Sequence, residues 1–250
     1  MRALVIAVVC ALVPVRAGAA DLTDAAVRAY DEYFAAARHT FVTGAAAARE
    51  DGVVRPGSGD GILSKPDSLV HHWRGDVFLS GVTLDAVIAV SQAYADYPKI
   101  FKPIRAAKVL STSGDTRHVQ FRMRASGGGL SATLDVRSRI QWVRVDEQHA
   151  YVVSTSEEIR EVADAGKPTE RALPEGHDSG YLWRAASMTR FTATPDGVWM
   201  TMETVGLSRP FPSMLGWILQ PIARRLGRAS VGESMKEFAQ AVAARSKLAP

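Results

Sequence analysis

The sequence predicts an α+β fold in which a curved antiparallel sheet wraps around a long C-terminal helix, with an extra N-terminal helix. Short segments between residues 106 and 207 alternate apolar and polar side chains and are separated by turn sequences. From residue 214 onward, apolar side chains recur at helical spacing instead. Short turns join antiparallel neighbours, and a helix with one apolar stripe must cover another layer, so the two patterns together predict a helix on a sheet.

The composition is that of a globular protein. The chain has 250 residues, of which 47% are hydrophobic and 22% charged, which is enough apolar material for a core. The formal net charge of +4 is too small for affinity that depends on many phosphate contacts, so no nucleic acid is expected as a partner. A single Cys excludes disulfide frameworks and cysteine-based zinc sites. The sequence therefore gives no reason to expect a metal or a cofactor.

Residues 1–20 have the pattern of a secretory signal peptide. A positive start at Arg2 is followed by an apolar run over residues 4–13 and by the small residues Ala17, Gly18 and Ala19. The run is much shorter than the roughly 20 residues that a membrane-spanning helix needs. We therefore expect a cleaved leader and a secreted or periplasmic protein.

Residues 21–67 are expected to hold one helix followed by a loop. Thr23 stands where an N-cap belongs, and apolar side chains recur at helical spacing over residues 23–50, with a break near Gly44. Residues 51–67 are rich in Gly and Pro, a composition that is typical of a flexible linker.

Residues 68–250 are expected to form the main domain. A strand over residues 69–82 is followed by an amphipathic helix that Thr83 caps. The strands predicted after it are 106–111, 117–125, 131–146, 150–162, 181–193 and 197–207. Four arginines fall on the polar faces of neighbouring strands, and we expect ion pairs there with Asp135, Glu157 or Glu161; they are Arg122, Arg124, Arg137 and Arg139.

The C-terminal region is expected to be helical in two pieces. The first apolar stripe runs from Met214 to Leu226 and is interrupted by Pro221. Ser230 and Glu233 have capping-box spacing, which predicts the start of a second helix.

The order of strand, helix, antiparallel meander and long final helix is that of the helix-grip fold. Between about residues 71 and 245, the chain resembles the START-like (SRPBCC) superfamily of polyketide cyclases, lipid-transfer domains and coenzyme Q-binding domains. The resemblance rests on that order, on the bend at Tyr97 and Pro98, and on the segments 71–75 (HHWRG) and 180–184 (GYLWR). These two segments resemble a group of secreted bacterial members. The resemblance implies an apolar cavity between the sheet and the last helix.

Large apolar and basic side chains are the candidates for lining such a cavity. Arg74 and Arg184 each follow a tryptophan and are the candidates for binding a carboxylate or phosphate group. The full set of expected ligand-binding residues is Trp73, Arg74, Phe121, Met123, Trp142, Trp183, Arg184, Met202 and Trp217.

His71 and His72 are the candidates for acid–base chemistry. Adjacent residues of a strand point to opposite faces, so the pair is not expected to share a metal ion. One of the two should face the cavity, while a hydrogen-bonded structural histidine is the simpler interpretation. No Gly-x-Ser-x-Gly motif is present, which argues against a nucleophilic hydrolase.

The sequence leaves three functions open. The first is an exported protein that binds a hydrophobic small molecule such as a lipid, a quinone or a polyketide-like compound and can act as its carrier. Transient contact with a membrane surface would then involve Arg224, Arg225 and Arg228 beside Trp217. The second is a cyclase, dehydrase or isomerase, which requires a histidine, an arginine and a carboxylate such as Glu203 to converge in one cavity. The third is a structural or interaction module without a ligand, in which the first helix binds a partner or plugs the pocket.

Overall fold

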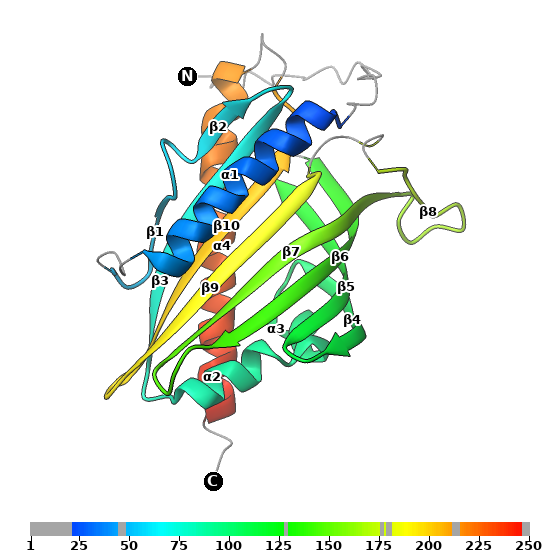
Figure 1. Ribbon diagram of the computed structural model, residues 1–250. Helices are drawn as coiled ribbons and strands as arrows, with labels where there is room; N and C mark the ends of the chain where they lie inside the picture. The colour runs from blue at the N-terminus through cyan, green and yellow to red at the C-terminus, as the bar shows by residue number, and fades with distance from the viewer. Residues whose placement is uncertain are drawn as a thin grey trace, which may run out of the picture.

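A computed structural model describes residues 22–44, 49–127, 130–175, 178, 182–211 and 216–246. The predicted signal peptide, residues 1–20, lies outside the described residues. The fold is the predicted α+β helix-grip fold, in which a curled antiparallel sheet holds a long C-terminal helix (Figure 1).

One ten-stranded sheet forms the body of the molecule. Its main path runs β1-β3-β10-β9-β7-β6-β5-β4, while β2 pairs with β3 and β8 pairs with β7. Every pairing is antiparallel, as the short turns predict. The strands are β1 (Val53–Pro56), β2 (Ile62–Lys65), β3 (Ser68–Ser80), β4 (Ile104–Ser113), β5 (Thr116–Gly127), β6 (Leu130–Arg144), β7 (His149–Ala163), β8 (Arg171–Ala172), β9 (Arg184–Thr194) and β10 (Gly197–Ser208).

Helices cover both faces of the sheet (Figure 1). Helix α4 (Gly216–Ser246) lies on the inner face, with α2 (Leu84–Ser91), a 3-10 turn (Tyr94–Asp96) and α3 (Tyr97–Ile100) beside it. Helix α1 (Asp24–Thr43) lies on the outer face. It begins at its predicted cap, where the Thr23 side chain accepts a hydrogen bond from the Ala26 N–H, and it ends at Gly44.

The alternation of β3 divides its side chains between two cores. Leu69, Trp73 and Leu79 point inward and pack in the core that includes Met235 and Phe238 of α4. Val70 points outward and packs in a second core with Tyr30 and Phe41 of α1, Trp183 and residues of β7, β9 and β10. Because helix α1 covers the outer face at β3, β9 and β10, that face is not open to water there.

The polar faces of β5 and β6 carry the predicted ion pairs. Arg122 binds Asp135 through two hydrogen bonds of 2.8 and 2.9 Å, and Arg137 lies 3.5 Å from Glu157. These groups are partly exposed, so they are a solvated ladder that adds little stability.

Residues 51–67 are not the predicted flexible linker. They form strands β1 and β2, which pair with two successive stretches of β3. Gly52, Gly59 and Gly61 have positive φ angles of 72°, 53° and 92°, which L side chains rarely adopt. The glycines that we interpreted as a sign of flexibility therefore turn the chain twice at one sheet edge.

The C-terminal region is one helix rather than the predicted two. Pro221 lies inside α4, in its second turn, where its missing N–H removes the hydrogen bond to the carbonyl of Trp217. Ser230 is an exposed helical residue and not a cap. The adjacent stripe from Val231 to Val242 packs continuously on the sheet, and this contact favours an unbroken helix over the local capping signal.

Candidate functional site

A pocket of about 430 Å³ lies beneath α1 on the outer face of the sheet. This volume is within the range of small-molecule sites. Its walls come from α1, from the segment 55–58 and from β3 and β10. The lining residues are Tyr33, Ala36, Ala37, Thr40, Arg55, Pro56, Gly57, Ser58, His72, Arg74 and Glu203.

Two paired strands place the charged groups of the pocket. His72, Arg74 and Asp76 share the outer face of β3, because side chains two residues apart point the same way. The antiparallel register aligns Glu203 of β10 with Arg74, and Thr201 with Asp76. Cross-strand neighbours on one face lie within contact distance, so this register concentrates the charges at one place.

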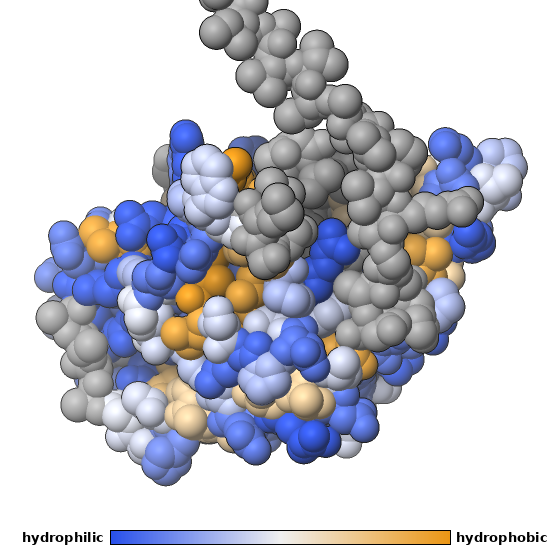
Figure 2. Space-filling model, turned by 90° about the horizontal axis from the view of Figure 1, so that it is seen from above, coloured by the Kyte–Doolittle hydropathy of each residue, from blue (hydrophilic) through white to orange (hydrophobic). Residues whose placement is uncertain are grey.

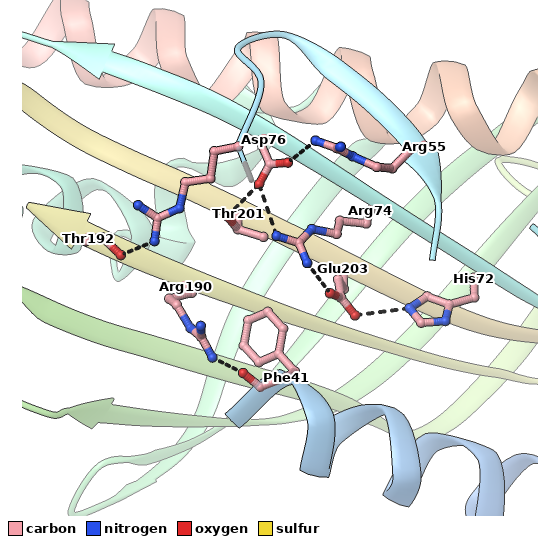
Figure 3. A network of polar contacts seen from close by, with 10 residues as sticks. Phe41, Arg55, His72, Arg74, Asp76, Arg190, Thr192, Thr201 and Glu203 are labelled. Atoms are coloured by element: carbon pink, nitrogen blue, oxygen red, sulfur yellow. Dashed lines mark hydrogen bonds and ion pairs between the residues drawn. The ribbon is translucent and has the colours of Figure 1, made fainter. Parts of the chain in front are cut away.

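Asp76 anchors one end of the resulting network (Figure 3). Its side chain is fully buried and accepts hydrogen bonds of 2.6 Å from Thr201 Oγ1 and 2.7 Å from Arg55 Nη2. Arg74 lies between the two carboxylates, 3.6 Å from Asp76 Oδ1 and 3.5 Å from Glu203 Oε1. The buried carboxylates are thus paired with guanidinium groups, as burial of charge requires.

His72 links Glu203 to a tyrosine of α1. Its Nε2 lies 3.1 Å from Glu203 Oε2, and its Nδ1 lies 2.7 Å from the hydroxyl of Tyr33. A neutral ring satisfies both contacts when Nε2–H donates to the carboxylate and Nδ1 accepts from the Tyr33 hydroxyl. Burial raises the pKa of Tyr33, with an opposing hydrogen bond to Ser58. The result is a Tyr33–His72–Glu203 chain through which a proton can pass.

A close approach of the backbone closes the pocket over His72. The Gly57 N–H donates to the His72 carbonyl at 2.9 Å. A β-carbon at residue 57 would lie 2.2 Å from Cδ2 of the imidazole, so this position has no space for a side chain.

Two further arginines extend the positive charge of the network. Arg49 donates a 2.8 Å hydrogen bond to Thr192, and Arg190 donates to the carbonyl of Phe41 and lies over its ring (Figure 3). Burial lowers the pKa of both guanidinium groups, and the nearby charge of Arg74 lowers it further. Arg49 and Arg190 thus add positive charge near Asp76 and Glu203, while their own hydrogen bonds go to Thr192 and Phe41.

His71 has no part in this site. It points to the opposite face of β3, and its Nε2 lies 2.8 Å from Ser208 Oγ. Burial lowers the pKa of His71 to about 4, so this ring is neutral at neutral pH. The expectation that the pair would face in opposite directions is confirmed, and His72 is the one that lines a pocket.

The other predicted ligand-binding residues do not line this pocket. Trp73, Phe121 and Trp142 are buried in the core that contains α4, and Met123 and Met202 pack against it. Trp183 is buried in the second core beneath α1, and Arg184 pairs with Glu175. Trp217 is 77% exposed. Arg74 is the one predicted ligand-binding residue that lines the described pocket. His72 and Glu203, which the enzyme hypothesis named, also line it.

Packing between β3 and α4 is close at two points. A β-carbon on Gly75 would lie 2.5 Å from Cε of Met235, and one on Gly227 would lie 2.3 Å from Nε1 of Trp73. The described pocket lies on the opposite face of the sheet from α4.

Polar members of the site that sequence reasoning missed include Tyr33, Arg55, Ser58 and Asp76. Asp76 carried a usable signal, because it lies on the same face of β3 as His72 and Arg74. The other three come from α1 and the segment before β3, and their position depends on how those segments dock.

The described part of the chain contains neither a metal-binding cluster nor a membrane-spanning helix. In the described ranges, no group of three or more His, Cys, Asp or Glu side chains is placed to hold a metal ion. No helix in this part of the chain has the length and apolar character needed to cross a membrane.

The sheet, the inner α2 and α3 and the C-terminal α4 follow one another in the order of a helix-grip fold. The chain is similar to a STAR-related lipid transfer protein from Xanthomonas axonopodis, with 16% identity over 74% of this chain and 95% of that one, and a TM-score of 0.45. It is also similar to human STARD10, with 11% identity over 76% of each chain and a TM-score of 0.47. The Zhui aromatase/cyclase from Streptomyces sp. R1128 has 15% identity over 71% of this chain and 94% of its own, with a TM-score of 0.45. No family model and no curated protein sequence matches the chain.

Proposed function

We propose that this protein binds a small organic molecule, part apolar and part polar, in the pocket beneath α1. The observation that carries the proposal is the convergence of His72, Arg74 and Glu203 at one end of the pocket. The rest of the wall is largely apolar and comes from Ala36, Ala37 and Pro56, with the ring of Tyr33. A concave site with a few polar groups on an apolar wall is the usual form of a small-molecule site.

The ligand class that this lining favours is a hydrophobic compound with a polar end, such as a lipid, a quinone or a polyketide-like molecule. We further propose that the protein is exported, on the basis of the leader pattern in residues 1–20. An exported binding protein with such a ligand is suited to carry it between membranes.

A surface on α4 supports contact with a membrane during such carriage. Trp217, Ile218, Ile222 and Leu226 are exposed, and hydrophobic residues gather among strongly hydrophilic ones on the end of the molecule seen in Figure 2. Arg225 and Arg228 are exposed on the same stretch of helix. Trp beside Arg is typical of helices that lie in the interface of an anionic membrane. Arg224 is not part of this surface, since it pairs with Asp60.

Extraction of the ligand tests the proposal. The full chain is expressed in a bacterial host, purified, extracted with organic solvent and analysed by mass spectrometry. Ala36→Trp fills the pocket, whereas Ala35→Trp adds the same side chain at an exposed residue of α1 that does not line it. We expect a compound in the wild-type and Ala35→Trp extracts that is lost from Ala36→Trp. Equal amounts in all three would mean binding elsewhere, and no compound in any would favour an interaction module.

The geometry also supports a second candidate, an acid–base enzyme acting on a carbonyl compound. The convergence that this hypothesis required is present, because His72, Arg74 and Glu203 line one pocket. Arg74 would stabilise negative charge on the carbonyl oxygen. Tyr33 would pass its hydroxyl proton to Nδ1 of His72 and take the α-proton of the substrate, while Glu203 would stabilise the resulting imidazolium; the reverse steps return both protons. Enzyme-dependent exchange of α-protons of aromatic ketones in D2O tests this role. Tyr33→Phe and His72→Gln should abolish it, and unchanged exchange in both variants would reject it.

A further inference from the structure

The guanidinium of Arg74 is held by charge but makes no hydrogen bond within the described part of the chain. Its contacts with Asp76 and Glu203, at 3.6 and 3.5 Å, are longer than ordinary N–H···O bonds. The short bonds of those carboxylates go elsewhere, to Thr201, Arg55 and His72. Arg74 therefore lines the pocket with its donors available to a ligand.

The surroundings of Arg74 favour an added negative charge. Arg49, Arg55 and Arg190 raise the number of guanidinium groups around Asp76 and Glu203 to four. Among the described residues, Nε of Arg55 is also buried without a hydrogen-bond partner. These guanidinium groups are only partly buried and outnumber the two carboxylates, so an anion at this end of the pocket would be attracted to them.

The geometry of the hydrogen-bond donors in the pocket indicates which type of anion would bind. A guanidinium presents parallel N–H groups that match the two oxygens of a carboxylate. The hydroxyls of Tyr33 and Ser58 lie at the same pocket and supply neutral polar groups. Glu203 and Asp76 flank the guanidinium and would repel a dianion such as a phosphate monoester more strongly than a singly charged group.

We propose that Arg74 binds the carboxylate of an amphipathic organic acid, whose apolar body lies along Ala36, Ala37 and Pro56. This inference rests on the proposed function, since it assigns a chemical class to the ligand of the same pocket. It also assigns a position, because the acid group must lie at the β3–β10 end of the pocket and the apolar body beneath α1.

The test compares probes that differ only in the head group. Binding of decanoate, decanol and decylamine is measured by titration calorimetry with the wild type, Arg74→Gln, Arg74→Lys and Arg105→Gln. Arg105 is an exposed residue of β4, remote from the pocket in the sheet order, so its variant removes the same charge without touching the site. We expect the wild type and Arg105→Gln to bind decanoate more tightly than decanol, and decylamine most weakly.

Arg74→Gln should weaken decanoate binding roughly 10- to 100-fold, the effect of losing a charge-assisted bidentate pair, and leave decanol binding unchanged. Arg74→Lys keeps the positive charge but not the two parallel N–H donors of the guanidinium, so it should retain part of the preference for decanoate over decanol. This variant also tests the role of the guanidinium if Arg74→Gln fails to fold. If decanoate and decanol bind equally and Arg74→Gln changes neither, the carboxylate inference is wrong while the pocket proposal stands. If none of the three probes binds the wild type, the carboxylate inference and the proposal of a pocket for such ligands are both overturned.

Discussion

Replacing Gly227 with Ala tests the close contact between α4 and the sheet. A β-carbon at residue 227 would lie 2.3 Å from Nε1, 2.8 Å from Cε2 and 3.0 Å from Cδ1 of Trp73. The indole is 3% exposed, so it has little room to move. Overpacking of this kind costs about 1–3 kcal/mol, against a gain of about 1 kcal/mol from the higher helix propensity of Ala. Because the contact is with a rigid ring, we expect a net loss of about 1–2 kcal/mol.

Gly232 in the same helix is the matched control. A β-carbon there would meet only Cγ2 of Val54, at an ordinary 3.6 Å, so Gly232→Ala should gain helix propensity without a clash. We expect it to be more stable than the wild type by up to about 1 kcal/mol. Thermal unfolding followed by circular dichroism should show Tm shifts of opposite sign, at about 2–4 °C per kcal/mol for a chain of this size. Equal shifts of the same sign would refute the assigned contact between Gly227 and Trp73.

Three further changes test the buried polar groups and the helix surface. Asp76→Asn should cost about 3–5 kcal/mol in urea unfolding, because it leaves Arg74 without one of its two buried counter-charges; adding Arg74→Gln should then cost less than the sum of the two single changes. Since burial lowers the pKa of His71 to about 4, only the unfolded chain takes up this proton between pH 6.5 and 4. Stability should fall by up to about 3 kcal/mol as the pH falls through that window, and His71→Gln should remove this part of the pH dependence. Trp217→Ser should weaken sedimentation with vesicles of phosphatidylglycerol, whereas an unchanged bound fraction would exclude the α4 surface as the contact.

Much of the fold could be predicted because strand and helix periods are local properties of the sequence. Alternation located the long strands, and the side chain of Thr23 caps α1 as its position indicated. Predictions failed where a residue type has two physical uses. Gly52 and Gly61 make turns between paired strands rather than a flexible loop, and Ser230 and Glu233, despite their capping-box spacing, lie inside one continuous helix.

The candidate site was predictable only as far as one strand extends. Parity on β3 separates His71 from His72 and places His72 on the same face as Arg74. The alignment of Glu203 with Arg74 follows from the register of β10, which is fixed across more than a hundred residues of intervening chain. Local patterns do not encode that register, although alternation does show which residues of β10 share one face of the sheet.

The choice of face was the larger difficulty, and it has a physical cause. On β3, the inner face presents the rigid ring of Trp73 against Gly227 of α4, so the two elements are in close contact at this point. The outer face has polar side chains at residues 72, 74 and 76, and such a face is normally interpreted as solvated. It becomes a pocket because α1 seals it from solvent on one side through Tyr30 and Phe41, at either end of Tyr33. The docking of α1 therefore turns a strand face that the sequence alone presents as solvated into a candidate site.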